Sequence, residues 1–132
     1  MARVTQASNL MIATAIFHNV FGLLLGFGLV APPGGAPRNL VAELLRAGVV
    51  DAVGADPLQM TFFWFEFTGA MAFSLGWMMR TVERQGLPVP AAIGWQLLAA
   101  GLLGAVLVPA SGLWLIVAQG ALLVYRSRKV AA

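Results

Sequence analysis

Four long apolar stretches dominate the sequence and restrict what this chain of 132 residues can fold into. They cover about residues 7–30, 58–79, 90–108 and 110–125. Each is near the ~20 residues that an α-helix needs to cross a hydrocarbon layer about 30 Å thick. Because lipid offers no partner to backbone polar groups, segments that cross it do so as helices. The pattern predicts an all-α fold, with residues 1–132 forming one integral membrane domain, a bundle of four transmembrane helices.

The composition supports a membrane protein and excludes several other classes. Charged residues make up 10% of the chain and hydrophobic residues 60%, with a mean hydropathy of +0.86, whereas about a quarter of a soluble domain is charged. The net charge is only +3, and the basic residues stand at helix ends, so nucleic-acid binding is not expected. The chain has no cysteine and a single histidine. A metal site of cysteines, or of several histidines from one chain, is therefore excluded, and we expect neither a metal nor another cofactor.

The distribution of basic residues predicts the orientation in the membrane. The loop of residues 31–57 holds two basic residues, diluted by three acidic ones, and the loop before the last span holds none. Six basic residues fall on the other side, namely Arg3, Arg80, Arg84, Arg126, Arg128 and Lys129. Since basic residues accumulate on the cytoplasmic side, both termini are predicted to be cytoplasmic, in a multi-pass protein of the bacterial inner (plasma) membrane.

The long first loop carries its own helix signals. Asn39 is a suitable cap for residues 40–50, where apolar residues recur at helical spacing. We predict a short amphipathic helix there, lying at the outer membrane surface or folding over the mouth of the bundle; a plain connector is the alternative. Asp56 before Pro57 predicts the start of the second span. Pro109 with the following Ser-Gly predicts a tight turn, so that the last two helices are antiparallel neighbours.

Two ionisable residues near the middle of the first and second spans, His18 and Glu66, are the candidate catalytic pair. An ionisable group at that depth is costly and by default marks a functional site. Glu66 lies in an aromatic run, where burial penalises the charged carboxylate, and an imidazole nearby can exchange its proton. Aromatic faces also stabilise a developing cation. The combination predicts acid–base isomerisation or cyclisation of a lipophilic substrate, isoprenoid-like or sterol-like.

Other polar and aromatic residues of the spans are predicted to complete this site. Asn19 and Gln96 would orient the pair or the substrate. Gly22 and Gly26 have the small-xxx-small spacing of a close helix contact. The side chains expected to bind the substrate in the pocket are those of Phe63, Trp64, Trp95 and Trp114.

Two further interpretations of the same residues stay open. In the first, the protein is a proton-coupled small transporter or channel subunit in which Glu66 carries the coupling proton; a chain this small would then need to form a homo-oligomer. In the second, it is a non-catalytic accessory subunit in which His18 and Glu66 only pair with each other. The expected partners are the lipid bilayer and a lipophilic small molecule.

Three motifs resemble those of a family of small, uncharacterised bacterial four-helix membrane proteins. They are the His18-Asn19-x-x-Gly22 of the first span, the Phe-Phe-Trp-Phe before Glu66, and the Pro-Ala-Ser-Gly-Leu-Trp-Leu that starts at Pro109. The resemblance covers most of the chain and implies the four-helix fold but no activity. The polar set is similar in kind to that of the emopamil-binding sterol isomerases. No motif is shared with them, so that comparison is a chemical analogy.

Overall fold

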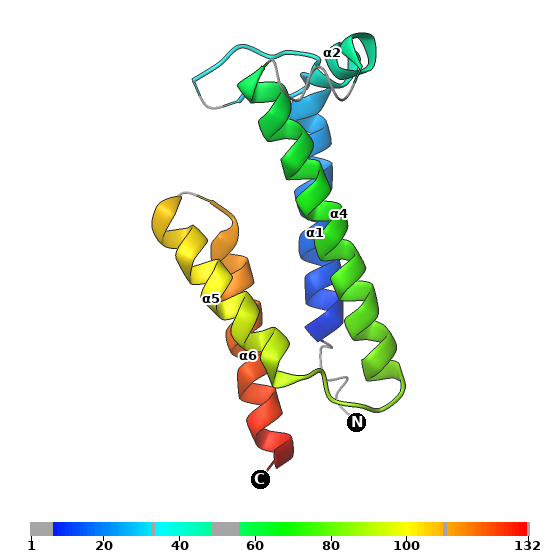
Figure 1. The fold of residues 1–132 in the computed structure, drawn as a ribbon, viewed down its shortest axis with the longest axis vertical. Coiled ribbons are helices and arrows are strands. Elements are labelled where there is room, and N and C mark those ends of the chain that lie inside the picture. The colour runs from blue at the N-terminus through cyan, green and yellow to red at the C-terminus, as the bar shows by residue number, and fades with distance from the viewer. Residues whose placement is uncertain (1–6, 33, 49–55, 110, 132) are drawn as a thin grey trace. The chain divides into compact units, whose positions relative to one another are not determined.

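The computed structural model describes residues 7–32, 34–48, 56–109 and 111–131. Over these residues the protein contains helices and no strands, which confirms the all-α prediction (Figure 1). The helices are α1 (Ala7–Gly26), α2 (Leu40–Ala47), α4 (Pro57–Arg84), α5 (Ala91–Leu107) and α6 (Leu113–Ala131).

Several helix ends differ from the predicted spans. α1 ends at Gly26, four residues earlier than predicted, because Gly28 takes a left-handed conformation (φ 71°) and the next amides bond back to the last turn. α4 continues to Arg84, and α6 starts at Leu113 and continues past Tyr125. Hydropathy marks where apolar side chains end, whereas helical hydrogen bonding continues through the charged residues that follow.

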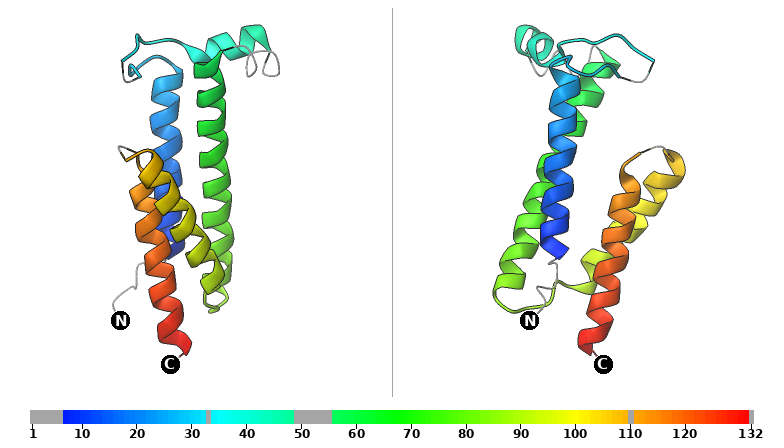
Figure 2. Two further views of the ribbon diagram at one scale, coloured as in Figure 1. Left: turned by 60° about the vertical axis from the view of Figure 1, so that its left-hand side comes forward. Right: turned by 180° about the vertical axis from the view of Figure 1, so that it is seen from behind.

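The chain forms two compact units, residues 15–73 and residues 1–14 with 74–132. In the unit of residues 15–73, the second half of α1 packs antiparallel against the first half of α4 (Figure 2). Glycines bring the helices together: a methyl group added to Gly22 would overlap Glu66 Oε1, and one added to Gly26 would overlap the Phe62 ring. The predicted contact at Gly22 and Gly26 is therefore confirmed.

α2 belongs to the same unit and has the predicted cap and amphipathic character. Asn39 Oδ1 accepts a hydrogen bond from the Ala42 amide at 2.9 Å. Leu40 and Leu44 are buried. The helix ends at Ala47, earlier than the predicted residue 50, and is followed by a glycine with φ 82°. Residues 49 and 50 lie outside the described residues.

In the other unit, α5 and α6 form the antiparallel pair that was predicted. Small residues let the two backbones approach closely. A methyl group on Gly101 would lie 2.9 Å from the Val117 amide nitrogen, and one on Gly120 would lie 2.5 Å from that of Leu98. The contact therefore depends on the absence of side chains at these positions.

The same unit ties the start of α1 to the end of α4. The Ala7 amide donates to Glu83 Oε1 at 3.1 Å, and the Ser8 hydroxyl donates to Glu83 Oε2. Further along α1, a hydrogen bond of 2.7 Å joins Gln119 Nε2 on α6 to Thr14 Oγ1. A carboxylate from a distant helix thus caps the N-terminus of α1.

α1 is long and apolar enough to cross a membrane. α5 is also apolar but is shorter, with 17 residues.

Candidate functional site

His18 is held by the residue that precedes the candidate acid. Its Nε2 lies 2.9 Å from the carbonyl oxygen of Phe65, and its ring stacks on the Phe65 ring with centroids 3.7 Å apart. Because a carbonyl oxygen only accepts, Nε2 donates this hydrogen bond. In the neutral imidazole, Nδ1 is then the nitrogen that can accept a proton.

No direct hydrogen bond joins Glu66 to His18, although the two were expected to approach each other directly or through one water or ligand group. The Oε1 atom of Glu66 is buried, has no hydrogen-bond partner and packs on the backbone of Gly22. The register of α1 against α4 explains the difference, because it sets Gly22 opposite the carboxyl and His18 opposite Phe65. The two candidate catalytic residues lie at the same helix contact, but no hydrogen bond joins them.

Asn19 of α1 packs at the same contact between α1 and α4, against a glycine of α4. Its Oδ1 atom is buried without a partner and packs on Gly69, one turn along α4 from Glu66. The arrangement is reciprocal, since each helix offers a glycine to a polar side chain of its neighbour. It leaves two buried acceptor oxygens, one on each helix, without a donor.

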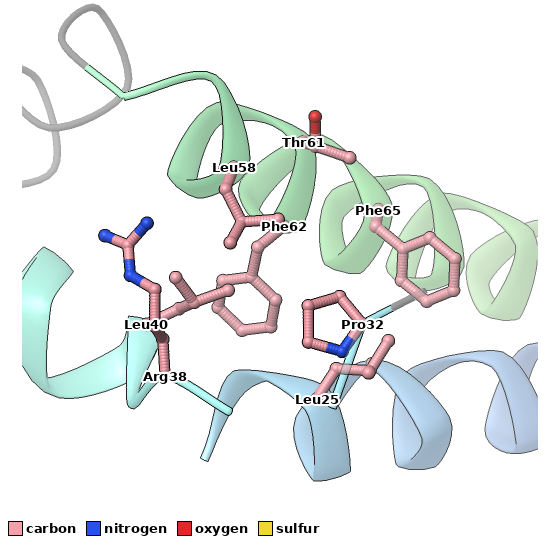
Figure 3. Close-up of a pocket in the computed structure, with 9 residues that line it drawn as sticks. Leu25, Pro32, Arg38, Leu40, Leu58, Thr61, Phe62 and Phe65 are labelled. Atoms are coloured by element: carbon pink, nitrogen blue, oxygen red, sulfur yellow. The ribbon is translucent and has the colours of Figure 1, made fainter. Parts of the chain in front are cut away.

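A pocket of about 320 Å³ adjoins this contact in the unit of residues 15–73 (Figure 3). Thr61 and Arg38 contribute its polar side chains, but the Thr61 hydroxyl turns away and donates to the Pro57 carbonyl at 2.8 Å. The remaining lining residues are Gly22, Leu25, Pro32, Leu40, Leu58, Phe62 and Phe65. The pocket is thus apolar over most of its wall and is built by α1, α2, α4 and the loop between the first two helices.

Gly22 lies between the pocket and the carboxyl group of Glu66. It lines the pocket, and Glu66 Oε1 packs against its backbone. Phe65, which lines the pocket as well, is the residue that holds His18. The carboxyl of Glu66 therefore adjoins the pocket wall, in an apolar setting where an unpaired polar atom is costly.

Arg38, which lines the pocket, belongs to a network of charged and polar side chains. Arg38 Nη2 lies 2.5 Å from Glu43 Oε2 and 2.7 Å from Asp56 Oδ2, and Gln59 Nε2 donates to Glu43 Oε2 at 2.9 Å. Asp56 Oδ1 also accepts from the Leu58 amide, which confirms it as the cap of α4.

These hydrogen bonds change the titration of the three charged groups. Arg38 lowers the pKa of Glu43, with a further contribution from Gln59. It lowers the pKa of Asp56 too, together with the Leu58 amide. The two carboxylates in turn raise the pKa of Arg38. Hydrogen bonds that favour the charged forms cause all three shifts.

None of the predicted site residues lines this pocket; His18, Asn19 and Glu66 lie at the adjoining helix contact. Phe63 and Trp64 form an aromatic cluster with Phe67 along α4, and the Trp64 side chain is 53% exposed. Three predicted residues lie in the other unit: Gln96 is exposed, Trp95 lies under the guanidinium of Arg128 at 5.9 Å, and Trp114 Nε1 donates to the Pro109 carbonyl at 3.0 Å.

The sequence did contain a signal for some of the pocket-lining residues that were not predicted. Phe62 and Phe65 stand on α4 opposite the glycines of α1. The spacing of Gly22 and Gly26 therefore pointed to the aromatic residues that fill the space they leave. The contribution of Pro32 and Arg38 depends on the course of the loop, for which the sequence pattern gave no signal.

The chain matches one protein family, described as a family of unknown function (DUF6463), over residues 3–130. Neither a curated protein nor a solved structure gives a match.

Proposed function

Given that the chain belongs to the DUF6463 family of unknown function, we propose that it is a small integral membrane enzyme. It binds a lipophilic molecule in the pocket between α1, α2 and α4, and Glu66 exchanges a proton with that molecule. The chain crosses the bacterial inner membrane four times, through α1, α4, α5 and α6, with both termini in the cytoplasm.

The apolar outer surfaces of the helices support the membrane assignment. Phe17 of α1 is 67% exposed, and Leu103 and Val106 of α5 are 64% and 71% exposed. Large apolar side chains exposed in such numbers along helices are unfavourable in water and favourable in lipid. Charged residues, by contrast, stand at helix ends and in loops, apart from Glu66.

One observation carries the functional proposal: Glu66 keeps a buried carboxyl oxygen without a hydrogen-bond partner, beside an apolar pocket. An unsatisfied buried acceptor costs about 1–3 kcal/mol. A residue whose only role was to hold two helices together would be expected to find a partner. A ligand that brings the missing donor, or that receives a proton from the carboxyl, explains why the group is left free.

The surroundings of Glu66 suit transfer of a proton to a carbon–carbon double bond. Protonation of an alkene by the carboxyl leaves a carbocation, which the faces of Phe62 and Phe65 would stabilise. Loss of a proton from a neighbouring carbon to the carboxylate then gives the isomer and restores the acid, so that atoms and charge balance. His18 positions this machinery, because it fixes the Phe65 ring and backbone next to the acid.

Deuterium incorporation tests the proposal even when the substrate is unidentified. The purified protein, in nanodiscs, is incubated in D₂O with a total lipid extract of its host, and the lipids are analysed by mass spectrometry. We expect at least one isoprenoid or sterol-like species to gain deuterium with the wild-type protein and none to do so with Glu66→Gln, which keeps the shape of the side chain but cannot exchange the proton. Trp114→Phe, outside the pocket, is the matched control and should retain the exchange.

The outcome also separates the enzyme from the transporter. Absence of deuterium incorporation by the wild-type protein, together with proton uptake into vesicles that is lost in Glu66→Gln, would replace the enzyme by a proton-coupled transporter. Equal behaviour of wild type and Glu66→Gln in both assays would leave Glu66 with a structural role.

A further inference from the structure

We propose that the pocket between α1, α2 and α4 takes a small uncharged amphiphile. Its hydrocarbon end lies toward Leu25 and Phe65, and its polar group, a hydroxyl or similar, lies at the end formed by Arg38. This inference rests on the proposed function, because it names the class and the orientation of the molecule that the same pocket binds. The double bond that accepts the proton then belongs to the hydrocarbon end, remote from the polar group.

The end of the pocket at Leu25 and Phe65 suits hydrocarbon, because polar groups of the lining there are turned away or already bonded. The Thr61 hydroxyl points out of the pocket and donates to a backbone carbonyl of its own helix at 2.8 Å (Figure 3). The Phe65 carbonyl binds the His18 ring at 2.9 Å, and the Leu25 carbonyl accepts from the Gly28 amide at 3.0 Å. A polar group of a ligand would lose its water there without gaining a partner, which is unfavourable.

The opposite end of the pocket is polar and partly exposed. In Figure 3 the Arg38 guanidinium points away from Phe65. The Arg38 side chain is 38% exposed, and those of its partners Glu43 and Asp56 are each 29% exposed. A hydroxyl group at this end keeps contact with water, and it can both donate to a carboxylate and accept from a guanidinium.

The charges at this end favour an uncharged polar group. Arg38 carries one positive charge, and its Nη2 atom lies 2.5 Å from Glu43 Oε2 and 2.7 Å from Asp56 Oδ2. A ligand carboxylate or phosphate would be repelled by these two carboxylates. An ammonium group gains little there, because both carboxylates already bind Arg38. A hydroxyl group meets neither difficulty.

The volume of the pocket limits the size of the molecule. At about 320 Å³ the pocket is near the lower end of the range for sites that bind small molecules. A small amphiphile can place its whole hydrocarbon part inside, whereas a long-chain membrane lipid would leave most of its chain outside. The substrate class is therefore a short-chain alcohol or a neutral relative of one.

Four probes with one chain and different ends test the class of ligand. Decanol, the decanediol with a hydroxyl group at each end, decylamine and decanoate are titrated into the whole protein in phosphatidylcholine nanodiscs, with empty nanodiscs as the blank for partition into lipid. Dissociation constants come from calorimetry. We expect decanol to bind most tightly and the diol about tenfold more weakly, because the second hydroxyl of the diol must be buried at the apolar end.

NMR and a variant test the orientation. Nuclear Overhauser effects should connect the terminal methyl group of decanol to Leu25, and the carbon that bears its hydroxyl to Leu40 of α2. Leu25→Gln, which adds a donor and an acceptor at the apolar end, should abolish the difference between decanol and the diol. Trp114→Phe, outside the pocket, should keep it. Circular dichroism shows whether each variant is folded, and the NMR contacts of the wild-type protein decide the orientation without any variant.

Each alternative outcome has a distinct meaning. Equal binding of decanol and the diol, or reversed contacts to Leu25 and Leu40, overturns the orientation but leaves the proposed lipophilic site intact. Tightest binding of the amine or of the carboxylate overturns the uncharged class. If the wild-type protein binds none of the probes, this inference and the pocket as the ligand site are refuted, whereas the role of Glu66 in proton exchange is still decided by deuterium incorporation.

Discussion

Gly120→Ala is expected to destabilise the α5–α6 pair, and the structure allows its cost to be worked out. A methyl group at this position would lie 2.5 Å from the Leu98 nitrogen and 2.9 Å from the Gly94 carbonyl oxygen, whereas ordinary contact begins at 3.4 Å. These are backbone atoms, which cannot rotate away as the end of a side chain can. The helices must therefore separate by roughly 1 Å, which forfeits much of the dispersion energy at the crossing.

The expected change in the free energy of unfolding is the difference between two opposing contributions. Overpacking of a close contact costs about 1–3 kcal/mol, here at the upper end because the backbone cannot yield. The higher helix propensity of alanine offsets about 1 kcal/mol of this cost. We expect the free energy of unfolding of Gly120→Ala to fall by about 1–2 kcal/mol relative to wild type.

The assay is unfolding by denaturing detergent, followed by circular dichroism of the purified protein in mild detergent. Gly112→Ala is the control, because a methyl group there meets nothing within 4 Å and the backbone is not left-handed. Its free energy of unfolding should stay within about 0.5 kcal/mol of wild type. Equal or greater stability of Gly120→Ala would refute the close α5–α6 contact and the reasoning built on it.

Three further predictions concern the unit of residues 15–73. Gly26→Leu should lower the melting temperature in detergent, because the new side chain would occupy the space of the Phe62 ring; unchanged melting would place that face toward lipid. Arg38 lowers the pKa values of Glu43 and Asp56 in the folded protein. The two carboxylates therefore contribute their full stability at pH values above the ordinary pKa values of these groups. This contribution is lost as the pH falls through the lowered pKa values of the folded state. Hydrogen exchange in α2, corrected for intrinsic rates, should therefore accelerate below about pH 4 in wild type, and Arg38→Met should remove this dependence. Leu45→Cys, at an exposed position of α2, should react with an impermeant maleimide on intact cells; labelling only after lysis would reverse the proposed topology.

Features that depend on local chemistry were predictable from the sequence. The cap at Asn39, the cap at Asp56 and the turn after Pro109 involve residues that are close in the chain, so their donors and acceptors are fixed by spacing. The glycine contacts of α1 followed from the spacing of Gly22 and Gly26 on one helix face. The all-α class followed from the length of the apolar stretches.

Features that depend on the register between helices were not predictable in the same way. His18 and Glu66 were expected to approach each other, directly or through one water or ligand group, because both lie near the middle of their spans. A shift of one turn along α4 decides whether the imidazole faces a carboxylate or the Phe65 carbonyl. The positions of the glycines alone do not say which residue of the facing helix each one meets. The aromatic residues assigned to the pocket failed for a related reason, since Trp64 and Trp95 have faces that suit lipid as well as a ligand.

The cap of α1 by Glu83 has a consequence for biosynthesis. The chain emerges from the ribosome with its N-terminus first, and the partner of the Ala7 amide lies 76 residues later. The first helix must therefore form with the hydrogen-bond donors of its opening turn bound to groups other than this carboxylate. Only when α4 has been synthesised as far as Glu83 can the carboxylate reach them. This contact is thus completed only after translation has passed Glu83, and a nascent chain truncated before Glu83 would lack this cap of the first helix.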